Sequence, residues 1–268
     1  MGHKQIDLMK AEMTVPGCEV AYIVYFLKKR HLIGELRLEI RDAAGALVAT
    51  LPAGKRRGIN RVEWTMRQPG PKFPPGEGII ASQGAFRGPR APEGTYTATL
   101  VKGQDTFQAP IQLVADPRSR ASAEDKALQH RTIWALHREI ERLAALVARI
   151  TGLRGQAQAR ALALPAGDGL RRQLEALGRT LDRQREALVS SQEGEGISGE
   201  QKLREELGML YGNVNSYEGR PTASQLQRME TLRAQDDAAH AAYEAVIRDL
   251  SRLNAMLAKR KLDALSSE

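Results

Sequence analysis

The sequence predicts an α+β protein with two segregated domains, an Ig-like antiparallel β-sandwich followed by an antiparallel bundle of about four long helices. Short segments in the first half alternate apolar and polar residues, which is typical of half-buried strands. Apolar residues in the second half recur at steps of three and four, which is typical of amphipathic helices. The pattern changes near Asp116-Pro117-Arg118, so we expect an N-terminal lead-in over 1–18, the sandwich over 19–118 and the bundle over 119–268.

Alternation is strictest between Glu35 and Arg41, where three apolar side chains fall on one face and the charged side chains fall on the other. The turn Asp42-Ala43-Ala44-Gly45 follows, and the apolar segment after it predicts the second strand of a hairpin. Trp64 is expected to anchor the core, and Tyr96 stands at a strand start, where its hydroxyl could bond to the backbone. Six or seven short strands of this kind indicate a sandwich. The expected strands are 20–27, 35–41, 46–51, 60–66, 95–101, 106–109 and 111–115.

The stretch 69–92 interrupts the strand pattern of the first domain. It is rich in glycine and proline and has no hydrophobic period. We expect a long loop there, and long loops often carry function.

Four apolar stripes predict the helices of the second domain, and the first and fourth are long enough for helices of roughly 40 residues. Capping signals begin at Ser122, Ser198 and Thr222, each with an acidic or amide side chain three residues later. Short glycine-containing breaks separate the stripes, which favours antiparallel neighbours. The stripes are Leu136, Ile140, Leu143, Val147 and Ile150; Leu170, Leu174, Leu177, Leu181 and Leu188; Leu203, Leu207, Leu210 and Val214; and Ala239, Tyr243, Val246, Leu250, Leu253 and Leu257.

Composition narrows the classes of function. The formal net charge is +8, which raises the expectation of an anionic partner, although 32 acidic residues are mixed among 40 basic ones. The single cysteine, Cys18, excludes an internal disulfide and a CxxC metal motif. No apolar run has the length of a membrane span, and no signal peptide is visible at the N-terminus.

Most of the excess charge lies in the first domain, where 17 basic and 11 acidic residues up to Arg118 give +6. Basic clusters at the expected strand ends could line one edge of the sandwich and bind a glycan carboxylate, a phosphate or an acidic protein. The alternative is that these charges keep edge strands from aggregating. The helical domain carries only +2, so nucleic acid is an unlikely partner for it. The predicted rim consists of Lys28, Lys29, Arg30, Lys55, Arg56, Arg57, Arg61, Arg87 and Arg90.

Three further patterns suggest chemistry but have simpler interpretations. His130 and His137 share a helix face, but a metal site would need further ligands there. The spacing Gly194-x-Gly196-x-x-Gly199 formally matches a dinucleotide fingerprint, yet it lies between helices and not after a strand. Asp236, Asp237 and His240 are expected on a solvated helix face. We therefore predict no catalytic, cofactor-binding or metal-binding residue in this chain.

Several short sequence motifs resemble those of a known family. They are Leu38-Glu39-Ile40-Arg41-Asp42-Ala43-Ala44-Gly45, the pattern Gly58-x-Asn60-x-Val62-x-Trp64, Gly94-Thr95-Tyr96 and, in the helical half, Tyr217-Glu218-Gly219-Arg220-Pro221. From about Cys18 onward the chain resembles the C-terminal region of sortilin-like, Asp-box β-propeller proteins, which are often labelled glycosyl hydrolases. The strand half is also similar to the Ig-like module of flagellar hook-capping proteins.

The resemblance implies a partner and a location. It implies docking to the β-propeller domain of a parent protein or to another protein, and a periplasmic or extracellular home. No Asp-box motif is present, so no catalytic residue carries over. We therefore expect a non-catalytic accessory module, with a sandwich for docking or ligand contact and a bundle as spacer or docking surface. The alternatives are a stand-alone polyanion- or nucleic-acid-binding module that uses the basic rim, and a part of a glycoside hydrolase whose catalytic domain lies elsewhere.

Overall fold

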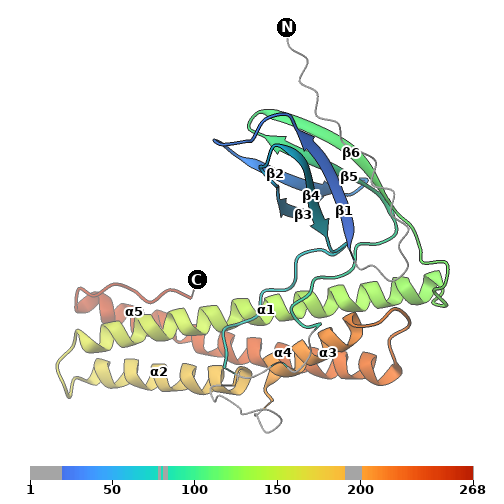
Figure 1. Ribbon diagram of the computed structural model, residues 1–268. Helices are drawn as coiled ribbons and strands as arrows, with labels where there is room; N and C mark the ends of the chain where they lie inside the picture. Colours follow the sequence, from blue (N-terminus) through green and yellow to red (C-terminus); the bar gives the residue numbers. More distant parts are fainter. Residues whose placement is uncertain (1–19, 78–79, 81–83, 191–200, 268) are drawn as a thin grey trace. The chain divides into compact units, whose positions relative to one another are not determined.

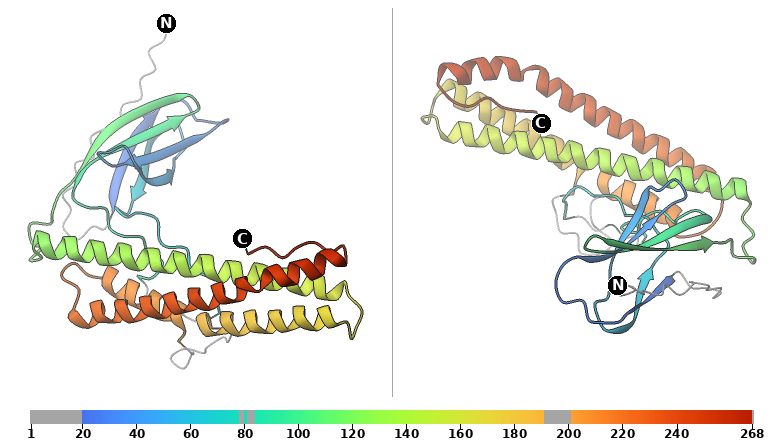
Figure 2. Two further views of the ribbon diagram at one scale, coloured as in Figure 1. Left: turned by 180° about the vertical axis from the view of Figure 1, so that it is seen from behind. Right: turned by 90° about the horizontal axis from the view of Figure 1, so that it is seen from above.

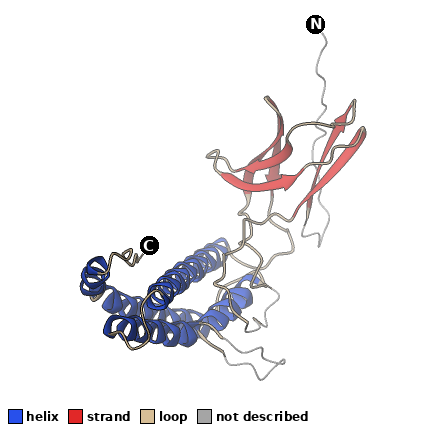
Figure 3. Cartoon of the chain, turned by 90° about the vertical axis from the view of Figure 1, so that its left-hand side faces the viewer, coloured by secondary structure: helices blue, strands red, loops and turns tan. Residues whose placement is uncertain are grey.

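A computed structural model describes residues 20–77, 80, 84–190 and 201–267 of the chain. The chain divides into two compact units (Figure 1). The strand unit contains the chain up to Gly70 together with Arg87–Ala121, and the helical unit contains Pro71–Phe86 together with Ser122–Glu268. Within the described residues the strands belong to the first unit and the helices to the second, so the fold class is α+β with strands N-terminal and helices C-terminal (Figure 3).

The strand unit contains two antiparallel sheets. One sheet pairs β1 with β4, and the other has the order β3-β2-β5-β6. The predicted hairpin between the second and third strands is confirmed, because β2 pairs antiparallel with β3. The Asp42 carboxylate accepts hydrogen bonds from the backbone of the turn. The strands are β1 (Ala21–Leu27), β2 (Leu36–Arg41), β3 (Leu47–Pro52), β4 (Gly58–Trp64), β5 (Gly94–Lys102) and β6 (Asp105–Leu113).

One hydrophobic core lies between the two sheets, and Trp64 and Tyr96 are buried in it. Their rings meet edge to face at a centroid distance of 5.4 Å. The Tyr96 hydroxyl donates to the backbone oxygen of Pro92 at 2.7 Å, which confirms the expected bond from this strand start. The Trp64 indole N–H donates to the backbone oxygen of Arg67 at 3.3 Å, so both polar ring groups are satisfied.

Pro110 does not divide the last strand. The separate segments predicted over 106–109 and 111–115 are wrong, because β6 runs unbroken from Asp105 to Leu113 and Pro110 pairs with Thr97 of β5. Strand β6 lies at the edge of its sheet. A proline is tolerated in an edge strand, since one side of such a strand has no ladder partner to lose.

The helical unit is built along one long helix. Helix α1 extends for 40 residues and contributes an apolar stripe to a single core. The fourth predicted helix is two helices, because Asp249 interrupts it. The helices are α1 (Ala123–Leu162), α2 (Gly169–Leu188), α3 (Leu203–Asn215), α4 (Ala223–Arg248) and α5 (Leu250–Lys259).

Helices α2 and α3 both run antiparallel to α1, one after the other (Figures 1 and 2). Arg154 of α1 contacts Asp182 of α2, and Gln129 near the start of α1 donates to the backbone oxygen of Val214 near the end of α3. Helix α4 runs in the same direction as α1. The prediction that consecutive helices alternate in direction therefore fails between α2 and α3.

Two of the predicted capping signals are confirmed. The Ser122 hydroxyl accepts from the backbone N–H of Asp125 at 3.1 Å, and Thr222 and Gln225 form a complete capping box. The predicted signal at Ser198 lies outside the described residues. Helix α3 begins after Lys202, whose backbone N–H is held by the Glu205 carboxylate at 3.1 Å.

The segment after α5 returns along the helices. Asn254 and Leu265 exchange two hydrogen bonds, and so do Gln156 and Ser266. Leu265 itself is buried in the helical core. Paired amide bonds of this kind let an irregular segment satisfy its backbone without strand or helix structure.

The loop predicted over 69–92 divides between the units. The sequence predicts that it belongs to the sandwich domain, but Pro71–Phe86 is part of the helical unit. Phe73 packs on the helical core, and Gly208 of α3 leaves space for Phe73 and Ile80, whose atoms would lie within 3.0 Å of an added Cβ. The Arg204 side chain donates to the backbone oxygen of Pro74 at 2.8 Å. A loop without hydrophobic period gave no signal for this contact.

We expect Arg204→Ala to lower the free energy of unfolding by about 3 kcal/mol. Arg204 and Glu205 form an ion pair at 2.7 Å, with side chains only 9% and 1% exposed, so the substitution leaves a buried carboxylate without its cation. Chemical denaturation measures the change. The control is Arg228→Ala, which breaks the more exposed ion pair to Glu206 and should cost about 1 kcal/mol at most. Equal losses in the two variants would contradict the proposed role of the Arg204 contacts.

Candidate functional site

The pairing of β1 with β4 gathers basic residues at one end of the strand unit. In this antiparallel pair Leu27 lies opposite Gly58, so the segment that follows β1 meets the segment that precedes β4. The backbone N–H of His31 donates to the backbone oxygen of Lys55 at 3.0 Å and joins the two segments. We call the six residues brought together here the basic end: Lys28, Lys29, Arg30, Lys55, Arg56 and Arg57.

Buried side chains hold the loop that carries half of the basic end. Asn60 is buried, and its amide accepts from the backbone N–H of Arg56 and donates to the backbone oxygens of Arg56 and Gly58. The Tyr25 hydroxyl donates to the backbone oxygen of Gly54 at 2.6 Å, and burial raises the pKa of Tyr25 to about 12. Gly54 has no room for a side chain, since an added Cβ would lie 2.6 Å from the Asn60 amide oxygen. The loop conformation is therefore fixed from the core outward.

The side chains of the basic end point to solvent. All six residues are exposed, and none forms an ion pair with another residue that the structure describes. Like charges on two adjoining segments repel one another, and an anion placed among them would relieve that repulsion. The arrangement offers several cationic donors on a backbone that is already held in place.

The other three residues of the predicted rim lie elsewhere. Arg61 is in the middle of β4, opposite Val24, with its guanidinium 3.7 Å above the Tyr22 ring and 3.7 Å from Glu63. The backbone of Arg90 forms an isolated antiparallel β-bridge with that of Arg67, beyond the opposite end of β4. Arg87 lies three residues before Arg90 in the same segment. The nine predicted residues thus do not form one rim, because the length of β4 separates Arg87 and Arg90 from the basic end.

Sequence reasoning missed the apolar surface beside the basic end. Phe26 and Ile59 are directly opposite each other on the outward face of the β1–β4 sheet, and both are exposed. Leu32 and Ile33, in the loop between β1 and β2, are 74% and 90% exposed. In the sequence, the apolar pair Leu32-Ile33 directly follows the basic run 28–31. Hydrophobic periodicity does not detect such a pair, because it identifies only repeating patterns.

A second group of titratable residues lies between α1 and α4. Asp236 has a fully buried side chain, with its carboxylate 3.2 Å from an Arg142 guanidinium nitrogen and 3.6 Å from the His240 imidazole. The expectation that the acidic pair of α4 is solvated is right for Asp237, which is 59% exposed, and wrong for Asp236. Burial raises the pKa of Asp236 to about 6, and the neighbouring carboxylate of Glu139 adds to the increase while Arg142 opposes it.

This buried group does not form an accessible active site. A catalytic carboxyl must touch its substrate, and Asp236 has no exposed surface. Burial, together with Arg142 and Arg149, lowers the pKa of His240. The group is therefore a buried polar cluster between two helices.

The histidines of α1 take part in ring packing. The Trp134 indole N–H donates to His130 Nε2 at 3.1 Å, and Trp134 packs on His137 with a centroid distance of 4.9 Å. Burial lowers the pKa of His130, which suits its role as acceptor. Within the described residues no group of three potential metal ligands converges. Cys18 and the glycines of the spacing 194–199 lie outside the described residues.

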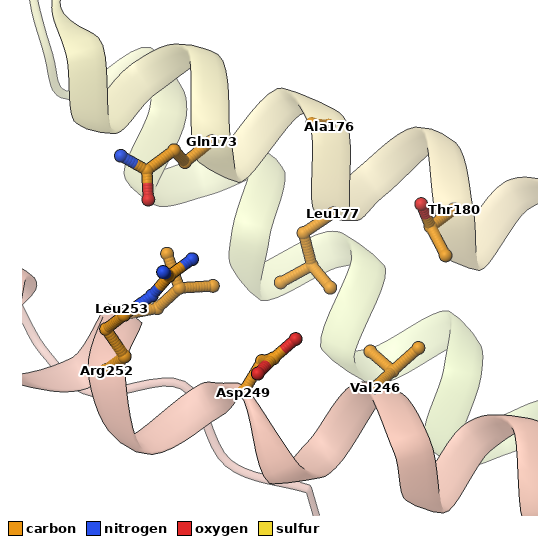
Figure 4. Close-up of a pocket in the computed structure, with 8 residues that line it drawn as sticks. All are labelled: Gln173, Ala176, Leu177, Thr180, Val246, Asp249, Arg252 and Leu253. Atoms are coloured by element: carbon orange, nitrogen blue, oxygen red, sulfur yellow. The ribbon is translucent and has the colours of Figure 1, made fainter.

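An open groove of about 270 Å³ lies between α2 and the α4–α5 segment (Figure 4). Gln173, Leu177 and Thr180 of α2 face Val246 and Asp249 across it. Figure 4 shows apolar and polar side chains mixed along both walls, without a nucleophile beside a base. The groove carries no constellation for chemistry.

Comparison with protein-family models, with curated proteins and with solved structures finds no match to this chain. Among the described residues, no helix has both the length and the apolar character needed to cross a bilayer. The basic end therefore stands on its own geometry as the candidate site.

We expect Asp236→Asn to change how stability depends on pH. The folded pKa of about 6 exceeds the ordinary aspartate pKa of 3.8, so the folded state holds this proton more tightly. The stabilising contribution of the proton disappears as pH rises through about 6. The free energy of unfolding of the variant should therefore gain about 2 kcal/mol relative to the wild type between pH 4 and pH 8. Urea denaturation across this range measures it. Asp237→Asn is the control and should follow the wild type. A constant difference between Asp236→Asn and the wild type would show that the folded carboxyl has an ordinary pKa.

Proposed function

We propose that this chain is a non-catalytic interaction module that binds an anionic partner through the basic end of its strand unit. One observation carries the proposal: six exposed cationic side chains converge on two loops, and Tyr25 and Asn60 hold one of these loops from the core. Arginine and lysine in such a cluster favour phosphate, sulfate or carboxylate groups. Because the Tyr25 and Asn60 contacts already fix the backbone of this loop, binding has to order the side chains but not the loop itself.

A binding role agrees with the chemistry of the other polar groups. The titratable cluster around Asp236 is closed to solvent, and the groove between α2 and α4–α5 holds mixed surface side chains. Each of these features has a sufficient explanation in packing. The accessible charged groups are those of the basic end, where Tyr25 and Asn60 fix the backbone of one loop. This arrangement supports a binding role.

We also propose that the strand unit is an Ig-like sandwich and that the helical unit is a spacer or docking surface. The bond from the Tyr96 hydroxyl back to Pro92 supports the first part, since it resembles the tyrosine corner of such sandwiches. Helix α1 supports the second part, because 40 helical residues extend for roughly 60 Å. On the resemblance to propeller proteins, we propose a β-propeller domain of an exported parent protein as the partner of this docking surface. An acidic glycan is an alternative anionic partner for the basic end.

Charge reversal at the basic end tests the proposal. We expect Arg56→Glu/Arg57→Glu to weaken binding to heparin by on the order of tenfold or more and to reduce the salt dependence, because fewer counterions are then released. Elution from immobilised heparin over a salt gradient measures both effects.

The matched control is Arg172→Glu/Arg179→Glu on α2, which changes the net charge equally at exposed positions of the other unit. This control should elute close to the wild type. Equal losses in the two double variants would mean that net charge, and not the basic end, determines binding. Unchanged binding in Arg56→Glu/Arg57→Glu would locate the site elsewhere.

A further inference from the structure

Two aliphatic side chains stand at the tip of a fixed loop beside the basic end. Leu32 and Ile33 are 74% and 90% exposed, respectively. The loop is held on one side by the hydrogen bond from the His31 backbone to Lys55, and His31 Nε2 lies 3.2 Å from the backbone oxygen of Gly34. Gly34 has a φ of 93°, which favours glycine at this turn. The exposure thus belongs to a defined loop conformation.

The apolar surface continues onto the sheet. Phe26 and Ile59 form a cross-strand pair on the outward face of the β1–β4 sheet, next to the strand ends from which the basic end begins. The apolar side chains therefore have cationic neighbours along the chain and across the pair. The nearby Glu35 carboxylate pairs with Arg37 of β2, so it does not neutralise the basic end.

We infer that the anionic partner of the basic end is a lipid bilayer surface that contains anionic headgroups. Leu32 and Ile33 enter the boundary between headgroups and acyl chains, while the lysines and arginines contact phosphates and carboxylates of the headgroups. This inference rests on the proposed function, because it names the partner of the same site. Lipid binding that is both stable and peripheral needs two such signals, one apolar and one electrostatic.

The apolar residues decide between lipid and the other anions. Single-stranded nucleic acids are bound by aromatic side chains on which bases stack, whereas the most exposed apolar side chains here are Leu32 and Ile33, and Phe26 is only 40% exposed. Leu32 and Ile33 have no hydrogen-bonding groups with which to recognise a sulfated sugar. A bilayer is the anionic surface that offers hydrocarbon directly behind its charges.

Sedimentation with vesicles tests the inference on the intact chain. We expect the protein to bind vesicles of phosphatidylcholine mixed with phosphatidylserine and to leave pure phosphatidylcholine vesicles unbound. Leu32→Ser/Ile33→Ser should weaken binding to the mixed vesicles by about tenfold or more, since about 0.8 kcal/mol is lost for each methylene removed from the apolar phase. The same variant should bind heparin like the wild type.

The matched control is Leu47→Ser/Val114→Ser, which removes two exposed aliphatic side chains at the opposite end of the strand unit. It should bind mixed vesicles like the wild type. Loss of vesicle binding in this control as well would overturn the assignment to the tip.

The outcomes separate the two proposals. The lipid inference is overturned if the wild type binds heparin but not mixed vesicles. It is also overturned if Leu32→Ser/Ile33→Ser binds heparin and mixed vesicles as tightly as the wild type does. In either case the basic end remains an anion site. If Arg56→Glu/Arg57→Glu binds both ligands like the wild type, the proposed function fails and the lipid inference fails with it. Selective loss of vesicle binding in the tip variant supports both.

Discussion

The antiparallel pairing of β1 with β4 is the constraint on which the strand unit and its basic end depend. The inner faces of this pair carry Tyr25 and Trp64 into the core against the four-stranded sheet. The same register sets Leu27 opposite Gly58, so the two basic segments meet at one end. Asn60, buried on β4, then fixes the loop between the sheets. Packing of the core and presentation of charge are thus two results of one strand pair.

Glycines determine how closely the 71–86 segment approaches the helices. An added Cβ on Gly76 would lie 2.3 Å from the Val189 side chain, and one on Gly84 would lie 2.7 Å from the backbone oxygen of Gly212. Gly208 makes the corresponding space on α3. Gly84 lies against the backbone of Gly212, whereas Gly76 and Gly208 make room for side chains of the facing segment, and a Cβ at any of the three would collide with its neighbour. The helical unit is therefore completed by a segment from the middle of the strand sequence.

The hydrophobic periods of the sequence predicted where the strands and helices lie, but not which segments pack together. The alternation around Leu38 and the stripe that begins at Leu136 correspond to β2 and α1. Strand register depends on contacts between distant residues, so the separation of Arg90 from the basic end was not predictable. Asp236 lies one position from the exposed Asp237, and its burial depends on Arg142 of another helix. Residues 71–86 have no period at all, so their assignment to the helical unit needed the structure.

Asp236 is buried although it is polar, and Leu32 and Ile33 are exposed although they are apolar. These two exceptions have different causes. Asp236 is a buried carboxyl, yet Arg142 and Glu139 surround it, so helix packing explains its position. Leu32 and Ile33 are exposed, and the core of the strand unit is complete without them. The turn that holds them uses backbone groups, His31 and Gly34, so polar side chains at the tip would fit the same loop. Folding therefore does not account for their apolar character, whereas contact with hydrocarbon behind a layer of negative charge does.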